Sequence, residues 1–222
     1  DSSRRAIVFA SSSLDSQVYH ELGSLFRNRL LVGQNGKFDL KGLYPHTGSL
    51  ELFFDTMLAS YTFDERPGIH GLKHQAVEHL GAPQYDDEIK QYTAGGRSYA
   101  YIPRPILYKY NAYDIVCTHD LFQMYVRRYS EPAYAGLRRV HDLLVDASNQ
   151  LMFVELNGIA IDREYLRTLS EEYLRRINDI REDIQQLVGW EINPNSPLQV
   201  KKQLLAYRVR VDSTAVDTIT SL

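Results

Sequence analysis

The sequence has little of several features that define common protein classes. Its 222 residues include a single cysteine, Cys117, which excludes a disulfide framework and favours a reducing, cytoplasmic environment. It has neither a recognisable signal peptide nor an apolar run long enough to span a bilayer, so no membrane association is expected. The net charge is only −3, so a site for a polyanion must be local rather than part of a general basic field.

What the sequence does have is enough apolar material for a core. Hydrophobic residues make up 44% of it, which supports one large domain or two small ones. The 16 tyrosines are many for this length, and each needs a partner or water for its hydroxyl group. We therefore expect a soluble globular protein with many polar groups at the margin of its core.

The first half of the chain predicts an α/β layer. Three short apolar runs are typical of strands, namely Arg5–Ala10, Leu30–Val32 and Leu50–Phe54. Between the first two lies an amphipathic helix, for which Asp15 or Ser16 is the expected N-cap. Asp55 is well placed to cap a further helix after the third run. Strand, helix and strand at this spacing indicate an α/β fold.

Polar residues follow the second predicted strand. The segment NGKFD carries Asn35 and Asp39 just beyond that strand. Open α/β sheets bind ligands at the carboxyl ends of their strands, so both residues are candidates for a site. Asn-Gly is also a strong turn former, and aspartate often caps the helix that follows. By itself, the segment favours the turn.

A second pair of candidates lies on a helix predicted from Lys109 to Tyr125. Tyr110 and Asp114 are one turn apart on the same face of this helix. Both side chains can reach a single point in a cleft, for instance a metal ion and the water that it activates. On spacing alone, the commoner arrangement is a partly exposed helix whose Asp114 faces solvent.

The segment from Tyr92 to Pro105 is punctuated by glycine and proline and is predicted to be a loop. It carries Arg97 and Arg104 among tyrosines. Arginine interleaved with aromatic rings suits single-stranded nucleic acid, whose bases stack and whose phosphates pair with cations. An ordinary solvated loop fits the same residues equally well.

After Glu131-Pro132, the pattern becomes helical throughout. Three helices are predicted, at about Ala135–Glu155, at Leu166–Leu187 behind an Asp162 cap, and at Pro197–Ala206 behind a Ser196 cap. The middle helix has a coiled-coil-like apolar stripe, which indicates packing rather than chemistry. Lys201 and Lys202 lie on the last helix, where a solvated face is the alternative to a ligand contact.

Three segments in order, NGKFD, then FDTMLASY and its continuation, then YNAYD, resemble the proofreading exonuclease domain of family A DNA polymerases, the bacterial polymerase I type. NGKFD is similar to the family's second exonuclease motif and YNAYD to its third. The resemblance implies that Asp39 and Asp114 are metal ligands. It also implies that Tyr110 orients the attacking water and that Asn35 helps to shape the site. Two Mg²⁺ or Mn²⁺ ions roughly 4 Å apart would then serve hydrolysis of the 3′-terminal phosphodiester.

The second half extends the resemblance. ELNGIAIDREYL, a long helix and GWEINPNSPLQVKKQLL are similar to the entry of the polymerase domain, where long helices form the thumb. The resemblance implies an α/β, ribonuclease H-like exonuclease domain over residues 1–130, with a mixed sheet flanked by helices and its first strand or strands missing. Over residues 131–222 it implies the start of an all-helical thumb, truncated before palm and fingers. The implied DNA-binding residues are Asn35, Arg97, Asn193, Ser196, Gln199, Lys201, Lys202, Arg208 and Arg210.

One departure from the family pattern affects the expected activity. The family's first motif, an aspartate and a glutamate two apart on the opening strand, has no match near Asp1. Two of four expected carboxylates are therefore missing, and the abrupt start favours truncation over loss. With Asp39 and Asp114 alone, the site should hold two ions poorly or hold none. This chain alone is expected to be a weak or inactive exonuclease, and without the palm it cannot synthesise DNA.

The resemblance also implies the partners. They are a single-stranded 3′ end of DNA and a primer–template duplex, in the cytoplasm of a bacterial or phage-infected bacterial cell. The alternative is a catalytically degenerate exonuclease fold that binds DNA without cutting it. A stand-alone exonuclease similar to ribonuclease D shares the Tyr110–Asp114 spacing, but the thumb-like second half argues against it.

Overall fold

The computed structural model of the chain describes residues 5–215. The chain divides after Gly158 into two compact units. Within the described range, no helix is both long enough and apolar enough to cross a membrane.

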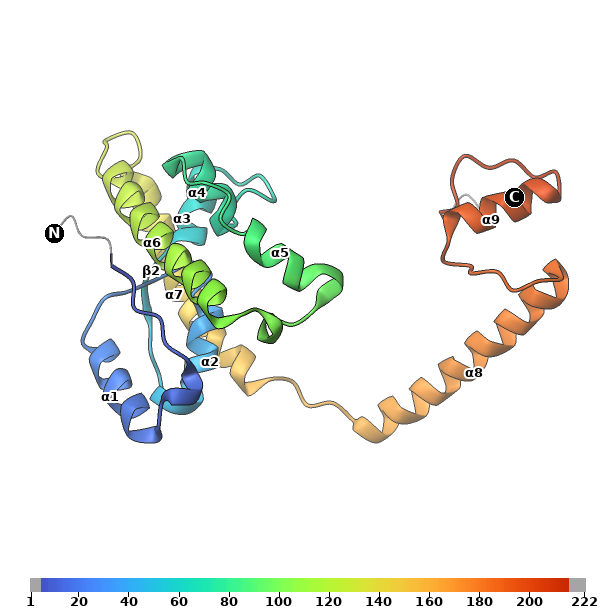
Figure 1. Cartoon of the computed structure of the whole chain (residues 1–222), viewed down its shortest axis with the longest axis horizontal. Helices are drawn as coiled ribbons and strands as arrows, with labels where there is room; N and C mark the ends of the chain where they lie inside the picture. Colours follow the sequence, from blue (N-terminus) through green and yellow to red (C-terminus); the bar gives the residue numbers. More distant parts are fainter. Residues whose placement is uncertain (1–4, 216–222) are drawn as a thin grey trace. The chain divides into compact units, whose positions relative to one another are not determined.

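In the first unit, helices surround a small parallel sheet (Figure 1). Strands β1 and β2 pair in parallel, with Leu31 opposite Leu52 and Gly33 opposite Asp55. The elements in order are α1 (Ser16–Arg27), β1 (Leu31–Gly33), α2 (Lys37–Thr47), β2 (Leu52–Asp55), α3 (Thr56–Phe63), α4 (Leu72–Leu80), α5 (Asp87–Thr93), α6 (Arg104–Tyr129) and α7 (Ala135–Asn157).

The core of this unit consists of two clusters that share β2. The first joins Leu52 of β2 to α2 and α7, and the second joins Phe54 of β2 to α3 and α6. Phe54 is fully buried, with its ring edge-to-face against Phe122 and close to the His141 ring. Apolar contacts in both clusters thus stabilise the buried position of β2. The buried members are Leu40, Leu50, Leu52, Val145 and Met152 in the first cluster, and Phe54, Ala59, Leu121, Tyr125 and Tyr129 in the second.

Side chains of α7 bond to β2 as a neighbouring strand would. The Asn149 amide accepts a hydrogen bond from the Leu52 N–H and donates one to the Leu52 carbonyl, both at 3.0 Å. Two turns earlier on α7, the His141 Nε2 lies 3.4 Å from the Asp55 nitrogen and 3.2 Å from the Asp55 oxygen. Buried backbone groups without partners are costly, so these contacts bind α7 to the sheet.

This packing extends the first compact unit beyond the boundary placed at residue 130 from the sequence. Helix α7 contacts β2, α2 and α3, and the unit ends at Gly158. Gly158 has a φ of 69°, a left-handed conformation that glycine adopts without strain, and it ends α7.

The strand predicted at Arg5–Ala10 is wrong. These residues form no ladder, and Ile7 and Phe9 are largely exposed. A strand needs a partner along its backbone, and none of the described residues supplies one here. The sheet of the described residues accordingly has two parallel strands, rather than the mixed arrangement expected. Helix α5 was also not predicted, because its short polar sequence has no clear apolar period.

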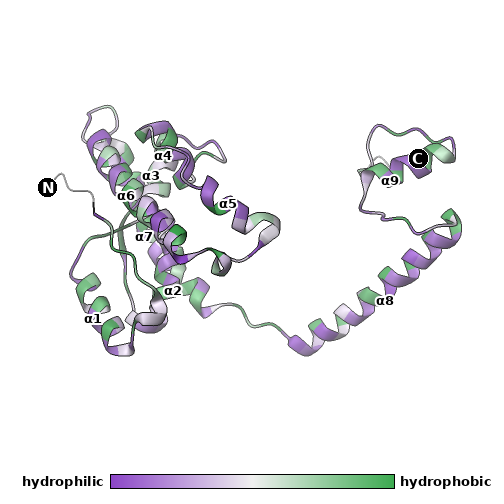
Figure 2. Cartoon of the chain, in the orientation of Figure 1, coloured by the Kyte–Doolittle hydropathy of each residue, from purple (hydrophilic) through white to green (hydrophobic). Residues whose placement is uncertain are grey.

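The second unit contains the two helices predicted for it. Helix α8 spans Arg163–Val188, capped by the Asp162 carboxylate, and helix α9 spans Pro197–Ala206, capped by Ser196. Hydrophobic and hydrophilic residues alternate along α8 (Figure 2), and none of its residues is buried. The predicted helix is confirmed, whereas the packing predicted for its apolar stripe is not observed among the described residues.

We expect Asn149→Leu to destabilise the first unit by roughly 2–4 kcal/mol, because leucine leaves a buried N–H and a buried carbonyl of β2 without partners. Urea unfolding of the whole chain measures this. The matched control is Gln150→Leu, an exposed neighbour on the same helix, with a change within about 0.5 kcal/mol. Equal unfolding midpoints for the two variants would contradict the strand-like role of Asn149.

Candidate functional site

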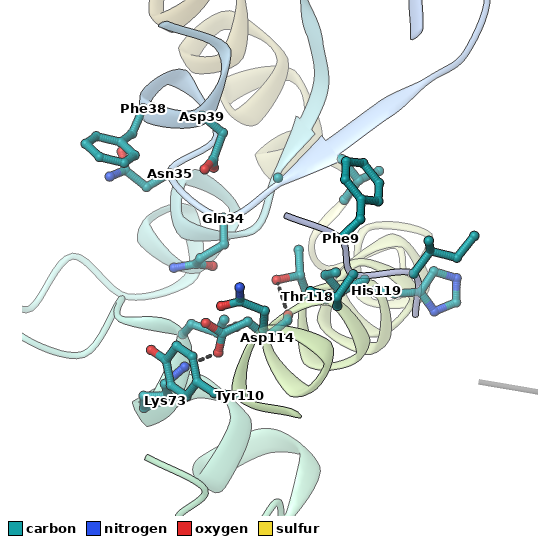
Figure 3. Close-up of a pocket in the computed structure, with 17 residues that line it drawn as sticks. Phe9, Gln34, Asn35, Phe38, Asp39, Lys73, Tyr110, Asp114, Thr118 and His119 are labelled. Carbon is teal, nitrogen blue, oxygen red and sulfur yellow. Dashed lines mark hydrogen bonds and ion pairs between the residues drawn. The ribbon is translucent and has the colours of Figure 1, made fainter. Parts of the chain in front are cut away.

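A cleft of about 950 Å³ opens beside the carboxyl end of β1 (Figure 3). Its walls come from residues 7–9, from β1 and the turn after it, and from the first turn of α2, the start of α4 and the middle of α6. In the figure, Asp39 approaches from α2 and Asp114 from α6, with Gln34 between them. The polar and charged lining residues are Gln34, Asn35, Asp39, Lys73, Tyr110, Asn111, Asp114, Thr118 and His119.

The turn after β1 places Asp39 at this cleft. Asn35 has a φ of 54°, the left-handed region that asparagine tolerates better than most residues. A Cβ on Gly36 would lie 2.9 Å from a methyl group of Leu52, so a larger residue here would have to displace this buried side chain of β2. Helix α2 then starts at Lys37, with Asp39 in its first turn. The positive end of the helix dipole favours a carboxylate there, but burial and the charge of Asp55 outweigh this effect at Asp39.

The carboxylate of Asp55 holds the turn in place. It accepts hydrogen bonds from the N–H groups of Asn35 at 3.1 Å and Gly36 at 2.8 Å. The same carboxylate caps α3 by accepting from Met57 at 2.8 Å and Leu58 at 3.4 Å. Asp55 is 1% exposed, so these donors replace the water that the charge has lost. Asp55 is therefore structural, as predicted, and it also positions the turn that carries Asp39.

The surroundings of Asp39 disfavour its ionised form. Partial burial and the nearby negative charge of Asp55 raise the pKa of the Asp39 carboxyl above its usual range. Its side chain remains exposed to solvent in part, so water moderates the effect. A carboxylate in this condition gains from any cation that enters the cleft.

Asp114 already has a cation beside it. Lys73, on α4, forms an ion pair with Asp114 Oδ1, and the Tyr85 hydroxyl donates to the same oxygen at 2.7 Å. The Lys73 ammonium also lies 4.2 Å from the centre of the Tyr110 ring and 4.3 Å from that of Tyr85. Figure 3 shows Lys73, Tyr110 and Asp114 gathered on one side of the cleft. The carboxylate, the ammonium and the two rings form one group, which we call the Asp114 cluster.

The two phenols of this cluster stay protonated at neutral pH. Burial, and after it the charge of Asp114, raises the pKa of Tyr110, and burial and Asp114 act in the same way on Tyr85. A protonated phenol donates a hydrogen bond and does not remove a proton from water. Tyr110 can thus orient a water molecule or a phosphate oxygen, but it is not a base.

The structure brings together four residues singled out from the sequence. Asn35, Asp39, Tyr110 and Asp114 all line the same cleft, although the first two and the last two come from separate parts of the chain. Arg97 lies outside the lining, exposed between two short 3-10 turns. The other DNA-binding candidates belong to the second unit, and they are Asn193, Ser196, Gln199, Lys201, Lys202, Arg208 and Arg210.

Local interactions hold several of these second-unit residues. The Gln199 amide oxygen accepts from the Asn193 N–H at 2.9 Å, and the Ser196 hydroxyl oxygen accepts from the Gln199 N–H at 3.5 Å. Lys201 donates to the Asp212 carbonyl at 2.6 Å. These contacts shape the loop before α9 and leave the positive charge of Lys201 available to an anion.

Sequence reasoning missed Lys73 and Tyr85. A lysine on an amphipathic helix is usually solvated, and a tyrosine in the turn after Pro83 has no distinctive spacing, so neither gave a signal. Their importance arises only because α4, the following turn and α6 meet at Asp114.

The described residues do not form a complete site for two divalent ions. Asp39 and Asp114 offer the hard oxygen ligands that Mg²⁺ prefers. No group of three or more His, Cys, Asp or Glu side chains that could hold a metal occurs among residues 5–215. Asp114, moreover, is already paired with Lys73. Two carboxylates carry too little charge for two divalent ions.

The fold and the cleft define an α/β protein with two carboxylates and a phenol at the carboxyl end of a parallel strand. A family model described as 3′-5′ exonuclease matches residues 3–127, more than half of the chain. The chain belongs to this 3′-5′ exonuclease family of family A DNA polymerases.

Curated relatives extend the similarity along most of the chain. DNA polymerase I of Borreliella burgdorferi is 26% identical over 216 residues, which cover 92% of this chain and 23% of that protein. DNA polymerase I of Chloroflexus aurantiacus is 33% identical over 190 residues, with 82% and 19% covered. The DNA polymerase of Escherichia phage T5 is 25% identical over 228 residues, with 91% and 25% covered. The chain thus spans about a quarter or less of the length of these relatives.

We expect Asp55→Asn to destabilise the protein by roughly 2–3 kcal/mol, because the new NH₂ group would face the Gly36 N–H, a donor against a donor. Asp15→Asn is the matched control, since Asp15 is an exposed cap of α1 and asparagine caps helices equally well. Urea unfolding compares the two. A loss in Asp55→Asn no larger than in Asp15→Asn would contradict the role of the Asp55 charge.

The raised pKa of Asp39 predicts that Asp39→Asn gains thermal stability, and that the gain depends on pH. Ionised Asp39 destabilises the fold above its folded pKa, and this effect disappears below the ordinary aspartate pKa of about 3.9. Asp39→Asn should therefore melt slightly higher than the wild type at pH 7, and the difference should shrink towards pH 4. Thermal melting across this range measures it.

Asp64→Asn provides a control of opposite sign. Hydrogen bonds from Arg66 lower the pKa of Asp64 to about 2, so ionised Asp64 stabilises the fold at neutral pH. Its replacement should lower the melting temperature at pH 7, and the loss should fade as the pH falls towards 2. A pH-independent difference for Asp39→Asn would show that the Asp39 charge has no cost in the fold.

Proposed function

We propose that the first unit removes nucleotides from a single-stranded 3′ end of DNA by hydrolysis, as the 3′-5′ exonuclease part of a family A DNA polymerase. The observation that carries the proposal is the convergence of Asp39, Tyr110 and Asp114 on one cleft in a member of this family. Relatives from bacteria and a phage support a bacterial or phage-infected cytoplasm as its place of action. The family also supports a ribonuclease H-like fold for the first unit.

Each of the three side chains has a chemical role in this proposal. Hydrolysis of a phosphodiester needs a water held in line with the bond and positive charge beside the phosphate. Tyr110, held protonated, orients the water through its hydroxyl group. Asp39 and Asp114 are the proposed metal ligands, and Asn35 shapes the wall between β1 and α2. Divalent ions supply water activation and charge neutralisation when bound.

The charge balance of the cleft supports weak activity for this chain. The described residues contribute two carboxylates, and Lys73 already neutralises one of them. Such a site holds divalent ions less tightly than one with four carboxylates. We therefore expect the chain on its own to trim a 3′ end slowly.

The second unit is proposed to be the start of a thumb that contacts a primer–template duplex. Lys201, Lys202, Arg208 and Arg210 would pair with phosphates, which gives sequence-independent and salt-sensitive binding. Asn193, Ser196 and Gln199 hold the loop before α9 and the start of the helix that carries Lys201 and Lys202. Arg97 is proposed as a phosphate contact of the first unit.

The second candidate function is an exonuclease fold that binds DNA without cutting it. The ion pair of Lys73 with Asp114 favours it, because a neutralised carboxylate is a poor metal ligand. The same lysine adds a positive charge that a phosphate can contact. The two functions agree on binding and differ on hydrolysis.

A 3′-end trimming assay separates them. We expect the whole chain, with Mn²⁺ and a 5′-labelled single-stranded oligonucleotide, to release nucleotides slowly from the 3′ end. Asp39→Asn and Asp114→Asn should each lower the rate at least about tenfold, because each removes one of the two carboxylates. Asp87→Asn, an exposed aspartate of α5 paired with Lys90, is the matched control and should keep the wild-type rate.

Binding of the same oligonucleotide, measured in parallel by fluorescence anisotropy, completes the assay. Binding without trimming in the wild type would favour the second candidate. Trimming that persists unchanged in both carboxylate variants would remove Asp39 and Asp114 from the mechanism.

A further inference from the structure

Lys73 is held in the cleft by more contacts than its ion pair alone. Its ammonium lies 3.0 Å from the Tyr85 hydroxyl, beside Asp114 Oδ1, and over the faces of the Tyr85 and Tyr110 rings. The Lys73 side chain is 30% exposed, and that of Asp114 is 28% exposed. Water screens such a pair less than a fully exposed one, and the two ring faces add cation–π attraction.

The Lys73 ammonium takes up Oδ1 of Asp114 and lies close to any metal ion that binds this carboxylate. Lys73 bonds to Oδ1, and the Tyr85 hydroxyl donates to the same oxygen. A divalent ion that coordinated this oxygen would face a positive charge within contact distance, and the repulsion would weaken its binding. The ion and the ammonium therefore compete for the negative charge of one carboxylate.

We infer that Lys73 is a resident counter-cation of Asp114, and that a divalent ion reaches Asp114 only by displacing it. This inference rests on the proposed role of Asp114 as a metal ligand. Lys73 is thus a positioning residue that sets how readily the cleft accepts a metal ion. Its flexible stem allows the ammonium to leave Asp114 without a change in the backbone of α4.

Metal binding to the whole chain tests the inference directly, with Mn²⁺ as the probe and electron paramagnetic resonance of free Mn²⁺ as the measurement. We expect Lys73→Met to bind Mn²⁺ about tenfold more tightly than the wild type, because the competing charge is gone. Lys109→Met is the matched control, since Lys109 pairs with the exposed Glu88 outside the cleft, and its affinity should equal that of the wild type.

A double variant shows whether the gain passes through Asp114. Lys73→Met combined with Asp114→Asn should lose the gain entirely, since the carboxylate for which the two cations compete is absent. An unchanged or weaker Mn²⁺ affinity in Lys73→Met would overturn the inference. So would a gain that persists in the double variant. Far-UV circular dichroism and thermal melting confirm that each variant is folded.

A measurement on the wild type needs no substitution. Amine acylation of Lys73, followed by peptide mass spectrometry, should speed up severalfold when Mn²⁺ is added, because displacement frees the ammonium. Acylation of Lys109 should stay constant. No change at Lys73 at Mn²⁺ concentrations that fill the Asp114-dependent site would also refute displacement.

The inference and the proposed function fail in different ways. Tighter Mn²⁺ binding in Lys73→Met, together with trimming unaffected by Asp39→Asn and Asp114→Asn, would support the counter-cation role of Lys73 and contradict the proposed exonuclease role of the two carboxylates. Trimming that depends on both carboxylates, together with unchanged Mn²⁺ affinity in Lys73→Met, would support the exonuclease function and contradict the counter-cation role of Lys73.

Discussion

The buried carboxylate of Asp55 is the interaction on which the site depends. It lies where β2 ends and α3 begins, and it bonds to N–H groups of both α3 and the turn after β1. A buried charge of this kind is stable only when several donors surround it. Because its donors come from both places, Asp55 fixes the start of α3 and the turn after β1 relative to each other. That turn leads directly into α2, so the position of Asp39 follows from Asp55.

The other edge of the same strand explains why α7 belongs to the first unit. Asn149 and His141 take the place of a neighbouring strand. Val145 and Met152 of the same helix belong to the apolar cluster that contains Leu52 of β2. A helix that satisfies the backbone of a strand cannot leave without exposing unpaired groups. The sheet thus needs both the Asp55 contacts and α7. The same contacts hold β1 and the turn after it, which form one wall of the cleft. The family model assigns the part of the chain that builds this wall to the 3′-5′ exonuclease family, and the ion pair of Lys73 with Asp114 lies in the same cleft.

Much of the local structure could be predicted because it depends on neighbours in sequence. Asp15, Asp55, Asp162 and Ser196 cap helices as expected, since a cap needs only the next few N–H groups. Residues 5–10 did not become a strand, because a strand depends on a partner far away in the chain. The resemblance drawn from NGKFD and YNAYD led to the family, and the family model confirms it. The metal-ligand and DNA-binding roles assigned to individual residues stay predictions.

The sequence by itself determined most of the helices, four of their caps, the two short strands β1 and β2 and the family, because these follow from short-range patterns of residue type, whereas the short polar helix α5 has no such pattern. Only the tertiary structure brought Asp39 and Asp114 to one cleft, joined α7 to the first unit and set Lys73 against Asp114. Those contacts join residues that are 41 or more positions apart. No local pattern encodes them, because they depend on how helices pack around a shared strand.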